Sequence, residues 1–250
     1  MSQGDKITVH WLNYSRSQRI IWLLEELNVP FEIKAYARDK DFRAPKALEK
    51  VHPLGKSPLI EVTKPDGETQ VIAETGHIIS YILEHYDPNH ILTPQNQREK
   101  QEVDYFLHYS EGTLQPNLVA LLVHSFAKKK APFGTRFLMG LLVKGIDDQF
   151  YLPETIKNLD FLDGILAKQK ATKNSDFFVG THLTGADIIL SFPVLTNIFA
   201  SRASARTMGL PDFDQTWPNL SRWCALIEKE PKFVKAHELV AEYETSKPNI

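Results

Sequence analysis

A turn rich in proline and glycine constrains the fold of this 250-residue chain more than any other stretch. It begins at His52, and Pro58 leads directly into an apolar β-type run that starts at Leu59. Proline cannot donate to a sheet ladder, so Pro58 is expected to open an edge strand or to lie beside a ligand. If the Ser57–Pro58 bond is cis, the backbone of Ser57 turns outward and can pair with a peptide-like ligand as a short added strand. Cis is the minority isomer of such bonds, and these residues alone leave both isomers open.

A second candidate binding element lies where another β-type run gives way to a helical pattern, at Glu74 and Thr75. The first turn of a helix has unpaired amides and a partial positive charge, so Thr75 is suited to hold a carboxylate. Glu74 beside it can take an ammonium group, and the two would then bind an amino-acid head group whose chain continues along Ser57. The simpler alternative is that Thr75 is an N-cap and Glu74 an acid favoured by the helix dipole.

The first third of the chain alternates between β-type and helical patterns. Strands are expected at 7–12, 31–36, 59–62 and 70–73, and helices at 15–28, 45–50 and from 75 to 86. The first two strands should be parallel because a helix separates them, and the last two antiparallel because a proline-glycine turn joins them. Ser15 and Gln18 form a capping-box signature at the start of the first helix. The order β-α-β-α-β-β-α is that of a thioredoxin-like domain.

The rest of the chain predicts a different architecture. Turn-forming residues at 87–97 indicate a linker, and 98–250 contains helical patterns without a strand pattern of comparable strength. Pro116 is expected to kink or break the first of these helices. The lysines at 128–130 suit a solvated turn, with contact to acidic lipid as the alternative. Thr184 and Asp187 form a capping pair, which assigns Asp187 to folding.

Composition restricts the classes of function. The chain has 29 basic and 31 acidic residues, a formal charge of −2, which argues against a nucleic-acid surface. The single cysteine, Cys224, allows no internal disulfide and suits a reducing compartment. The histidines show no paired metal-ligand spacing. No apolar run approaches the roughly 20 residues that a membrane span needs, so we expect no integral membrane segment.

The order of these features resembles that of the glutathione transferases over nearly the whole chain. The residues that carry the resemblance are the helix start Ser15-Arg16-Ser17-x-Arg19, the turn from His52 to Pro58, and the Glu74-Thr75 pair. The resemblance implies an α/β thioredoxin-like glutathione-binding domain at 1–86, a linker at 87–97 and an all-α C-terminal domain at 98–250.

The family also implies roles for individual residues. Ser57, before a cis Pro58, would pair with the cysteinyl backbone of glutathione, while Glu74 and Thr75 would hold its γ-glutamyl end. Lys56 and Arg43 are candidates for the glycine carboxylate of glutathione. A solvated surface arginine is an equally good interpretation of Arg43.

The chemistry requires only that the thiol of glutathione become a thiolate. A free thiol has a pKa near 8.5, and lowering it by about two units requires roughly 2.7 kcal/mol. A hydrogen bond to a charged group supplies about 1.5 to 3 kcal/mol, so one hydroxyl at the start of the first helix is enough. Serine-type members place this hydroxyl at the position of Ser15, and Asn13, Tyr14 and Ser17 are the alternatives. Trp11 stands where tyrosine-type members carry their tyrosine, and the absence of a cysteine in this loop counts against the omega and beta types.

The resemblance is greatest to fungal members related to bacterial and theta-like types. It implies a cytoplasmic, homodimeric transferase in detoxification and stress response, which conjugates glutathione to small hydrophobic electrophiles and could also reduce organic hydroperoxides. The electrophile pocket is expected between the domains. Some residues of the first helix after the linker could line it or could pack between helices: Tyr105, His108, Tyr109 and Glu111. The alternative functions are a non-enzymatic regulator and a ligand-binding protein that keep this fold.

Overall fold

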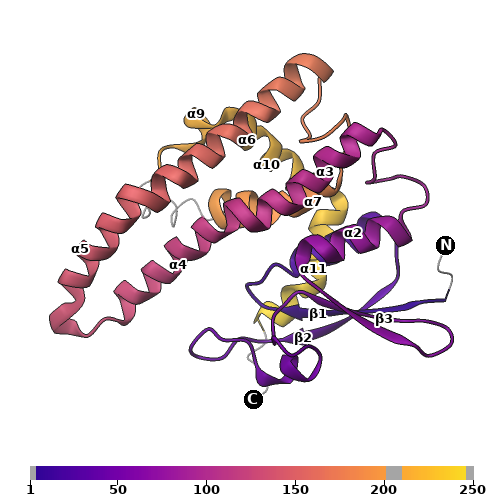
Figure 1. The fold of residues 1–250 in the computed structure, drawn as a ribbon, viewed down its shortest axis with the longest axis horizontal. Helices are drawn as coiled ribbons and strands as arrows, with labels where there is room; N and C mark the ends of the chain where they lie inside the picture. The colour runs from indigo at the N-terminus through magenta and orange to yellow at the C-terminus, as the bar shows by residue number, and fades with distance from the viewer. Residues whose placement is uncertain (1–3, 201–209, 246–250) are drawn as a thin grey trace.

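The computed structural model describes residues 4–200 and 210–245. Its first part is a four-stranded mixed sheet in the order β2-β1-β3-β4 (Figure 1). The strands are β1 (Lys6–Leu12), β2 (Phe31–Tyr36), β3 (Leu59–Thr63) and β4 (Thr69–Ala73). The helices are α1 (Gln18–Glu26), the short 3-10 helix η1 (Lys46–Lys50) and α2 (Thr75–Tyr86). β1 pairs with β2 in parallel, and β3 pairs with β1 and β4 in antiparallel, which confirms the thioredoxin-like fold predicted from the alternating patterns.

Of the two alternatives for Pro58, an edge strand or a place beside a ligand, the edge strand is wrong, because β3 lies between β1 and β4. The ladder of β3 begins at Leu59, which is opposite His10 on one side and Ala73 on the other. Pro58 therefore stands just outside the ladder, where its missing N–H costs no hydrogen bond.

The first helix begins later than its apolar pattern predicts, and the predicted capping box is not formed. Ser17 occupies the N-cap position of α1, and its side chain makes no capping hydrogen bond. The Oγ of Ser15 accepts from the backbone N–H of Ser17 at 3.3 Å, two residues further on. This contact closes a tight serine turn ahead of the helix, in place of the three-residue reach that a capping box needs.

Beyond residue 97, the described residues form helices and no strand, as predicted for an all-α region. The α-helices are α3 (Gln97–Tyr109), α4 (Gln115–Lys130), α5 (Arg136–Ile146), α6 (Leu152–Lys173), α7 (Gly185–Leu190), α9 (Phe213–Thr216), α10 (Pro218–Ile227) and α11 (Pro231–Thr245). Between them lie three π-helical segments, η2 (Ser110–Leu114), η4 (Asp147–Tyr151) and η5 (Ser191–Phe199), and the 3-10 turn η3 (Phe133–Thr135).

Pro116 does not break its helix, because η2 carries the chain from α3 into α4. The N–H of Gln115 bonds to the carbonyl of Ser110, five residues back. Such a wide turn makes room for the proline ring, which has no N–H to contribute. η4 plays the same part ahead of Pro153, where the N–H of Leu152 bonds to the carbonyl of Asp147.

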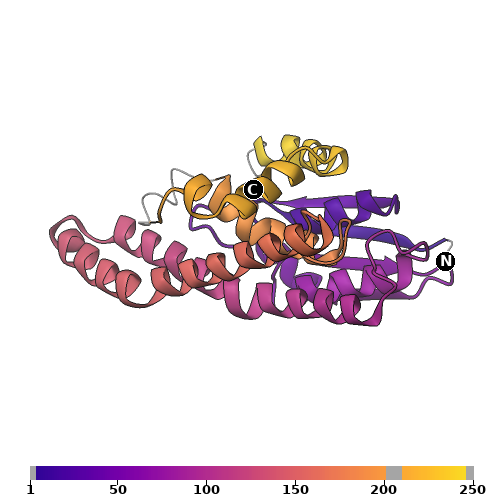
Figure 2. The same cartoon turned by 90° about the horizontal axis from the view of Figure 1, so that it is seen from above.

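The last helix returns to the first part of the chain, and α11 packs along α1 (Figure 2). The rings of Trp22 and Phe233 meet edge to face with centroids 5.0 Å apart. Lys235 pairs with Glu25 at 2.7 Å. A single cluster of buried apolar side chains runs through both parts of the chain. No helix in the described ranges is both long and apolar enough to cross a bilayer.

The capping box predicted at Thr184 is present and buried. The N–H and hydroxyl of Thr184 bond to Oδ2 of Asp187 at 3.0 and 3.1 Å. Its Oδ1 accepts from the N–H of Phe178 at 3.1 Å and from the indole of Trp223 at 2.9 Å. Burial raises the pKa of Asp187 to about 6, while these four donors oppose the shift. Asp187 thus joins three segments, which agrees with a folding role.

Candidate functional site

The strand register brings the candidate segments to one end of the sheet. His10 near the end of β1 pairs with Leu59 at the start of β3, and Leu59 pairs with Ala73 at the end of β4. The loop after β1, the turn before β3 and the start of α2 therefore all leave the sheet at the same end. Ser15, Ser57 and Glu74 lie in these three segments.

The turn before β3 has the backbone geometry that the family resemblance implies. The Ser57–Pro58 peptide bond is cis. Gly55 has φ +55°, and a Cβ built there would lie 2.8 Å from Cγ of Glu49, so this position requires glycine. The hydroxyl of Ser57 donates to the carbonyl of His10 at 3.1 Å. This bond fixes the turn against the end of β1.

Ser15 lies beside that turn. Its Oγ is 3.4 Å from Oγ of Ser57 and 2.7 Å from Oγ of Ser17. Ser15 is 8% exposed, whereas Ser17 is fully buried beneath it. The hydroxyl of Ser17 in turn lies 3.3 Å from the N–H of Leu12 and 3.4 Å from its carbonyl. Of these two serines, only Ser15 retains some exposed surface.

The other two loop residues considered as thiol donors are engaged differently. The Oδ1 of Asn13 accepts from the backbone N–H of Arg38 at 2.8 Å, and its carbonyl accepts from the Arg38 guanidinium at 3.1 Å. Tyr14 is exposed, has φ +51°, and stacks on Phe42 with centroids 5.8 Å apart. Both residues thus serve to hold the segment around Arg38 and Phe42.

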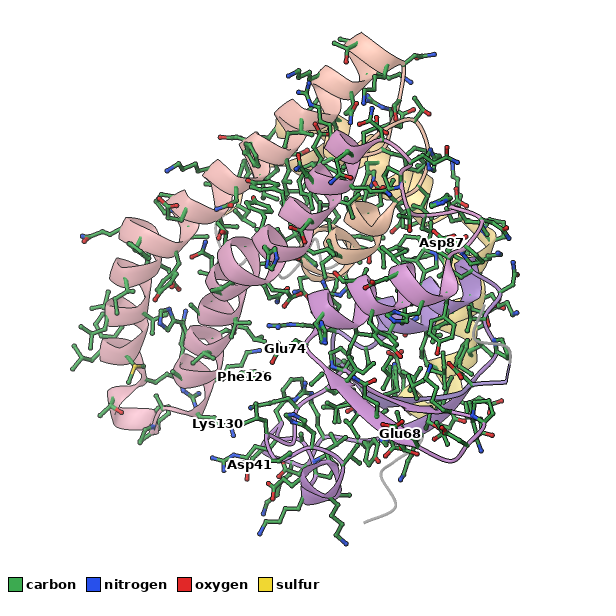
Figure 3. All side chains as sticks on the ribbon, turned by 45° about the vertical axis from the view of Figure 1, so that its right-hand side comes forward. Asp41, Glu68, Glu74, Asp87, Phe126 and Lys130 are labelled. Atoms are coloured by element: carbon green, nitrogen blue, oxygen red, sulfur yellow. The ribbon has the colours of Figure 1, made fainter. Side chains whose placement is uncertain are left out.

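Glu74 is the N-cap of α2, and Thr75 is the first residue of the helix, so the alternative that made Thr75 the N-cap is wrong. Glu74 has φ +70° and its carboxylate makes no capping bond. Such a backbone conformation costs a non-glycine residue about 1 to 3 kcal/mol, and residues of this kind cluster at ligand sites. Thr75 is 3% exposed. Figure 3 shows Glu74 on the side of the sheet domain that faces α4.

The two basic candidates lie on the surface around the same end of the sheet. Lys56 is exposed and directly precedes Ser57. Arg43 is also exposed, and its backbone N–H bonds to Oδ1 of Asp39 at 2.9 Å. The structure thus places Lys56 in the turn itself and Arg43 at the end of a neighbouring loop.

A partly buried ion network next to Ser15 was not predicted from the sequence. Nη2 of Arg19 lies 2.7 Å from one carboxylate oxygen of Glu111, and Nη1 of Arg16 lies 2.6 Å from the other. A second nitrogen of Arg19 donates to the carbonyl of Ile189. Burial lowers the pKa of Arg19 to about 10, and Glu111 opposes the shift. The signal in the sequence was a charged residue on the apolar face of the first helix, which requires an acid from elsewhere in the fold.

Of the four residues considered for the lining of an electrophile pocket, two are engaged in contacts inside the protein and two are exposed. Glu111 belongs to the ion network, and the hydroxyl of buried Tyr109 donates to Asn158 at 2.6 Å. Tyr105 stacks on Tyr109 and is half exposed, and His108 is exposed near Asp104.

Side chains of α4 reach across to the loop that carries Phe42. Phe126 packs on Phe42 with ring centroids 5.4 Å apart, and Lys130 pairs with Asp41 at 3.1 Å. Together with Tyr14, which stacks on Phe42, these rings form an aromatic row from the Ser15 loop to α4. Figure 3 shows Phe126 and Lys130 on the side of α4 that faces Asp41.

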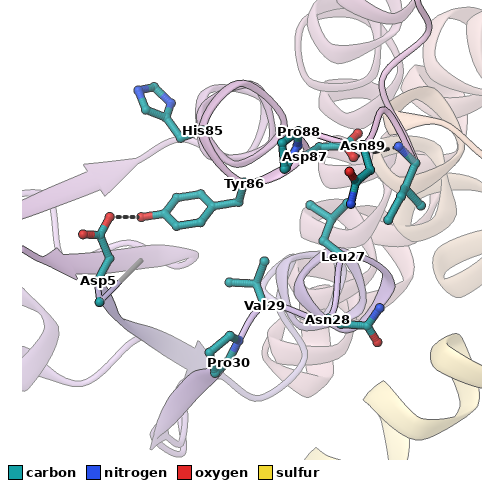
Figure 4. A pocket seen from close by; sticks show the side chains of 12 residues that line it. Asp5, Leu27, Asn28, Val29, Pro30, His85, Tyr86, Asp87, Pro88 and Asn89 are labelled. Atoms are coloured by element: carbon teal, nitrogen blue, oxygen red, sulfur yellow. Dashed lines mark hydrogen bonds between the residues drawn. The ribbon is translucent and has the colours of Figure 1, made fainter. Parts of the chain in front are cut away.

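One cavity of about 390 Å³ lies at the opposite end of β1 (Figure 4). Its lining includes Asp5, the end of α1 at Leu27 and the start of the linker at Asp87. The hydroxyl of Tyr86 donates to Asp5 at 2.7 Å in its wall. Because Ser15 follows the other end of β1, this cavity is separate from the candidate site. Within the described residues, no cluster of three or more His, Cys, Asp or Glu side chains is placed to hold a metal ion.

Comparison with known proteins shows the family of this chain. Residues 15–85 match the family model for the glutathione S-transferase N-terminal domain. The chain is 36% identical to glutathione S-transferase 1 of Saccharomyces cerevisiae over 93% of its own length and 94% of the relative.

Solved structures show the same fold. A glutathione S-transferase from Actinobacillus pleuropneumoniae is 30% identical with a TM-score of 0.64, covering 94% of this chain and 93% of that one. Ure2p5 from Phanerochaete chrysosporium, cocrystallised with 1-(S-glutathionyl)-2,4-dinitrobenzene, is 20% identical with a TM-score of 0.72, covering 98% and 100%. The full-length relatedness and the shared fold show that this chain is a transferase and belongs to the glutathione S-transferase family, whose co-substrate is glutathione.

Proposed function

We propose that this enzyme conjugates the thiolate of glutathione to small hydrophobic electrophiles, with Ser15 donating the hydrogen bond that stabilises the thiolate. The observation that carries the proposal is the 3.4 Å between the hydroxyls of Ser15 and Ser57. It puts the hydroxyl of Ser15 beside the backbone segment that would hold the cysteinyl residue. The strand register supports the same arrangement, since Glu74 leaves the sheet at that end.

The hydroxyl pair explains how Ser15 keeps its proton for sulfur. Each hydroxyl has one proton and two acceptor lone pairs. The hydroxyl of Ser57 already donates to His10, and Ser15 accepts from the N–H of Ser17. The one proton of Ser17 can go to Ser15, 2.7 Å away, or to the carbonyl of Leu12, 3.4 Å away. When it goes to Ser15, Ser15 accepts twice and its own proton is left for sulfur. Two accepted bonds polarise that O–H and strengthen its donation to an anion.

The binding roles follow from the same placement. The backbone of Ser57, next to Pro58, would pair with the cysteinyl backbone of glutathione, because both precede the β3 ladder. Glu74 would take the γ-glutamyl ammonium, and the first turn of α2 at Thr75 its carboxylate. Lys56 and Arg43 would attract the glycine carboxylate as exposed cations.

The aromatic row of Tyr14, Phe42 and Phe126 would form one wall of the electrophile site. Its rings lie between the Ser15 loop and α4, and flat apolar electrophiles pack well on such rings. The Ure2p5 neighbour, which shares the fold, was crystallised with a glutathionyl dinitrobenzene conjugate. We therefore choose a chlorinated dinitrobenzene as the first substrate to test.

The other properties implied by the resemblance belong to the same proposal. They are a peroxidase activity toward organic hydroperoxides, a homodimer, a cytoplasmic location and a role in detoxification and stress response. The proposed division into domains, 1–86 and 98–250 around a linker at 87–97, is supported by the end of α2 at Tyr86 and the start of α3 at Gln97.

The test combines binding and turnover. Calorimetric titration of the full chain with glutathione should give one site per chain, and stopped assays with 1-chloro-2,4-dinitrobenzene and with cumene hydroperoxide should give turnover with at least one of them. Glutathione binding without turnover on any electrophile would contradict conjugation and favour a ligand-binding role. If the unmodified chain does not bind glutathione, the proposed glutathione site is contradicted.

A further inference from the structure

Arg16 is the most exposed member of the ion network beside Ser15. Its Nη1 lies 2.6 Å from one carboxylate oxygen of Glu111, and Arg19 takes the other oxygen at 2.7 Å. The side chain of Arg19 is 1% exposed, whereas that of Arg16 is 33% exposed. One carboxylate cannot neutralise two guanidinium groups, so the three side chains together carry a net positive charge. The part of this charge that has exposed surface is on Arg16.

The structure fixes Arg16 at both ends. Its carbonyl accepts from the backbone N–H of Arg19 at 3.3 Å and from Nε of the same residue at 3.5 Å. At the other end of the side chain, Glu111 holds the guanidinium. Because Arg16 directly follows Ser15, this cation begins one residue from the proposed thiolate donor. A charged donor held in this way needs little rearrangement when negative charge develops nearby.

The guanidinium of Arg16 lies between the Ser15 loop and the helical region. Glu111 belongs to η2, which continues directly into α4. Further along the same helix, Phe126 packs on Phe42 of the sheet domain with ring centroids 5.4 Å apart (Figure 3). The two contacts place η2 and α4 alongside the sheet domain. Arg16 is thus on the side of the Ser15 loop where the aromatic row would receive the electrophile.

Most of the donors of Arg16 remain available. A guanidinium has five N–H donors in a planar fork. Within residues 4–200 and 210–245, the side chain of Arg16 donates to Glu111 alone, through Nη1. The N–H groups on Nε and Nη2 can therefore bond to an oxygen of a bound molecule.

We propose that Arg16 is a further catalytic residue, whose guanidinium stabilises the negative charge that develops on oxygen atoms of the electrophile. The inference rests on the proposed conjugation. With 1-chloro-2,4-dinitrobenzene, the thiolate sulfur bonds to the ring carbon that carries chlorine, and a ring electron pair moves onto the nitro oxygens. The C–Cl bond then breaks, and chloride leaves with an electron pair as the ring becomes aromatic again. Arg16 would donate to the nitro oxygens while they hold the charge.

The proposal implies a substrate class. It consists of electrophiles in which a nitro or carbonyl oxygen is conjugated to the reacting carbon. An unsaturated aldehyde belongs to this class, because addition of the thiolate forms a C–S bond and moves an electron pair onto the carbonyl oxygen as an enolate. An alkyl halide does not belong to it, since its displacement puts no charge on oxygen.

The alternative role for Arg16 is to stabilise the thiolate itself. Its bond to Glu111 draws the guanidinium toward η2, in the helical region. The sulfur would instead lie over the sheet domain, beside the hydroxyls of Ser15 and Ser57. The geometry therefore favours contact with the electrophile, and the pKa of the bound thiol distinguishes the two roles.

The test uses 1,3,5-trinitrobenzene and glutathione with the full chain. Trinitrobenzene has no leaving group, so addition of the thiolate stops at a coloured σ-complex whose charge lies on the nitro oxygens. Removal of one preorganised donor costs on the order of 100- to 1,000-fold in an enclosed site. Because Arg16 is one-third exposed, we expect Arg16→Met to lower the formation constant of the bound complex about 10- to 100-fold.

Turnover should change selectively in the same variant. We expect kcat with 1-chloro-2,4-dinitrobenzene to fall as the formation constant does, while 1-iodohexane reacts at nearly the parent rate. The Kd for glutathione and the pKa of its bound thiol should stay unchanged. Arg16→Lys keeps the charge without the planar fork and should give an intermediate loss. The matched control is Arg98→Met, which removes an exposed arginine of α3 and should behave as the parent does.

The outcomes separate this inference from the proposed function. It is overturned if the parent forms no bound σ-complex or if Arg16→Met forms it as well as the parent. An equal loss with 1-iodohexane would show that Arg16 acts through folding of the loop, and a raised thiol pKa would show that it acts on sulfur; either result overturns the proposal. A parent that forms the complex without turning over any electrophile contradicts conjugation, and loss of the complex in Arg16→Met then still supports the role of Arg16.

Discussion

The guanidinium of Arg19 and the carboxylate of Glu111 meet at 2.7 Å, although 91 residues separate them in the sequence and they belong to different parts of the fold. Arg19 is fully buried and leaves α1 two residues after Ser17, while Glu111 lies in the π-helical segment η2. The contact therefore holds the helical region against the start of α1, next to the candidate catalytic loop.

Removing the charge of Glu111 should destabilise the protein. Glu111→Gln leaves the buried Arg19 without its counter-ion, and breaking a buried pair typically costs about 3 to 5 kcal/mol. Because Glu111 is itself one-fifth exposed, we expect a loss near 3 kcal/mol in the free energy of unfolding, measured in urea. The matched control is Glu102→Gln, which breaks an exposed pair with Arg98 and should cost less than about 0.5 kcal/mol. Equal losses in the two variants would show that the Arg19 pair contributes no more than a surface contact.

The two hydroxyls of the candidate loop should differ in their effects on the bound thiol. Ser15→Ala should raise the pKa of bound glutathione by about 1 to 2 units and lower kcat near neutral pH about 10- to 100-fold, with little change in glutathione affinity. Ser17→Ala should give a smaller rise, because Ser15 keeps its own hydroxyl and loses only the contact that polarises it, while the contacts of Ser17 with Leu12 are lost as well. The absorbance of the bound glutathione thiolate, measured as a function of pH, gives the thiol pKa in each variant. If the thiol pKa is unchanged in Ser15→Ala, a donor other than Ser15 stabilises the thiolate.

Glu74 should control affinity rather than the thiol. Glu74→Gln keeps the size of the side chain but removes the charge that would pair with the γ-glutamyl ammonium. A hydrogen bond to a charged group contributes about 1.5 to 3 kcal/mol, so the Kd for glutathione should rise about 10- to 150-fold. Glu84→Gln, an exposed acid on the same helix, is the control and should leave Kd unchanged. Calorimetry decides between the two, and equal affinity of the Glu74 and Glu84 variants would exclude the proposed pairing.

Asp187 should make stability depend on pH between about 4 and 6. Its pKa is 3.8 in the reference state and about 6 when buried, so in this window the native state binds the proton and the unfolded chain does not. The stability contributed by the protonated carboxyl is complete below pH 4 and is lost as the pH rises to 6. The loss amounts to roughly 3 kcal/mol from the shift of about two units. Asp187→Asn, though less stable, should lack this component when urea unfolding is followed at both pH values. A steeper decline in the variant would mean that the carboxyl favours its charged form.

The sequence predicted the parts of the fold that local patterns specify. The four strands end within one residue of their expected positions, because alternation, proline and glycine define strands over short distances. The break expected at Pro116 and the helix start expected at Ser15 were wrong, because π-helical and serine-turn hydrogen bonds leave no period in the sequence. The Glu111 network was missed for another reason. Its partners are brought together by packing between distant elements, and an acid in a polar segment looks like any solvated acid.

The position of α11 has a consequence for how the enzyme forms. The face of α1 that carries Trp22 is covered by Phe233, more than two hundred positions later in translation. The helix that follows the Ser15 loop stays partly uncovered until nearly the entire polypeptide has been synthesised. Contacts of such long sequence separation form slowly. We therefore expect the packing of α11 on α1, and with it catalytic competence, to be completed late in folding.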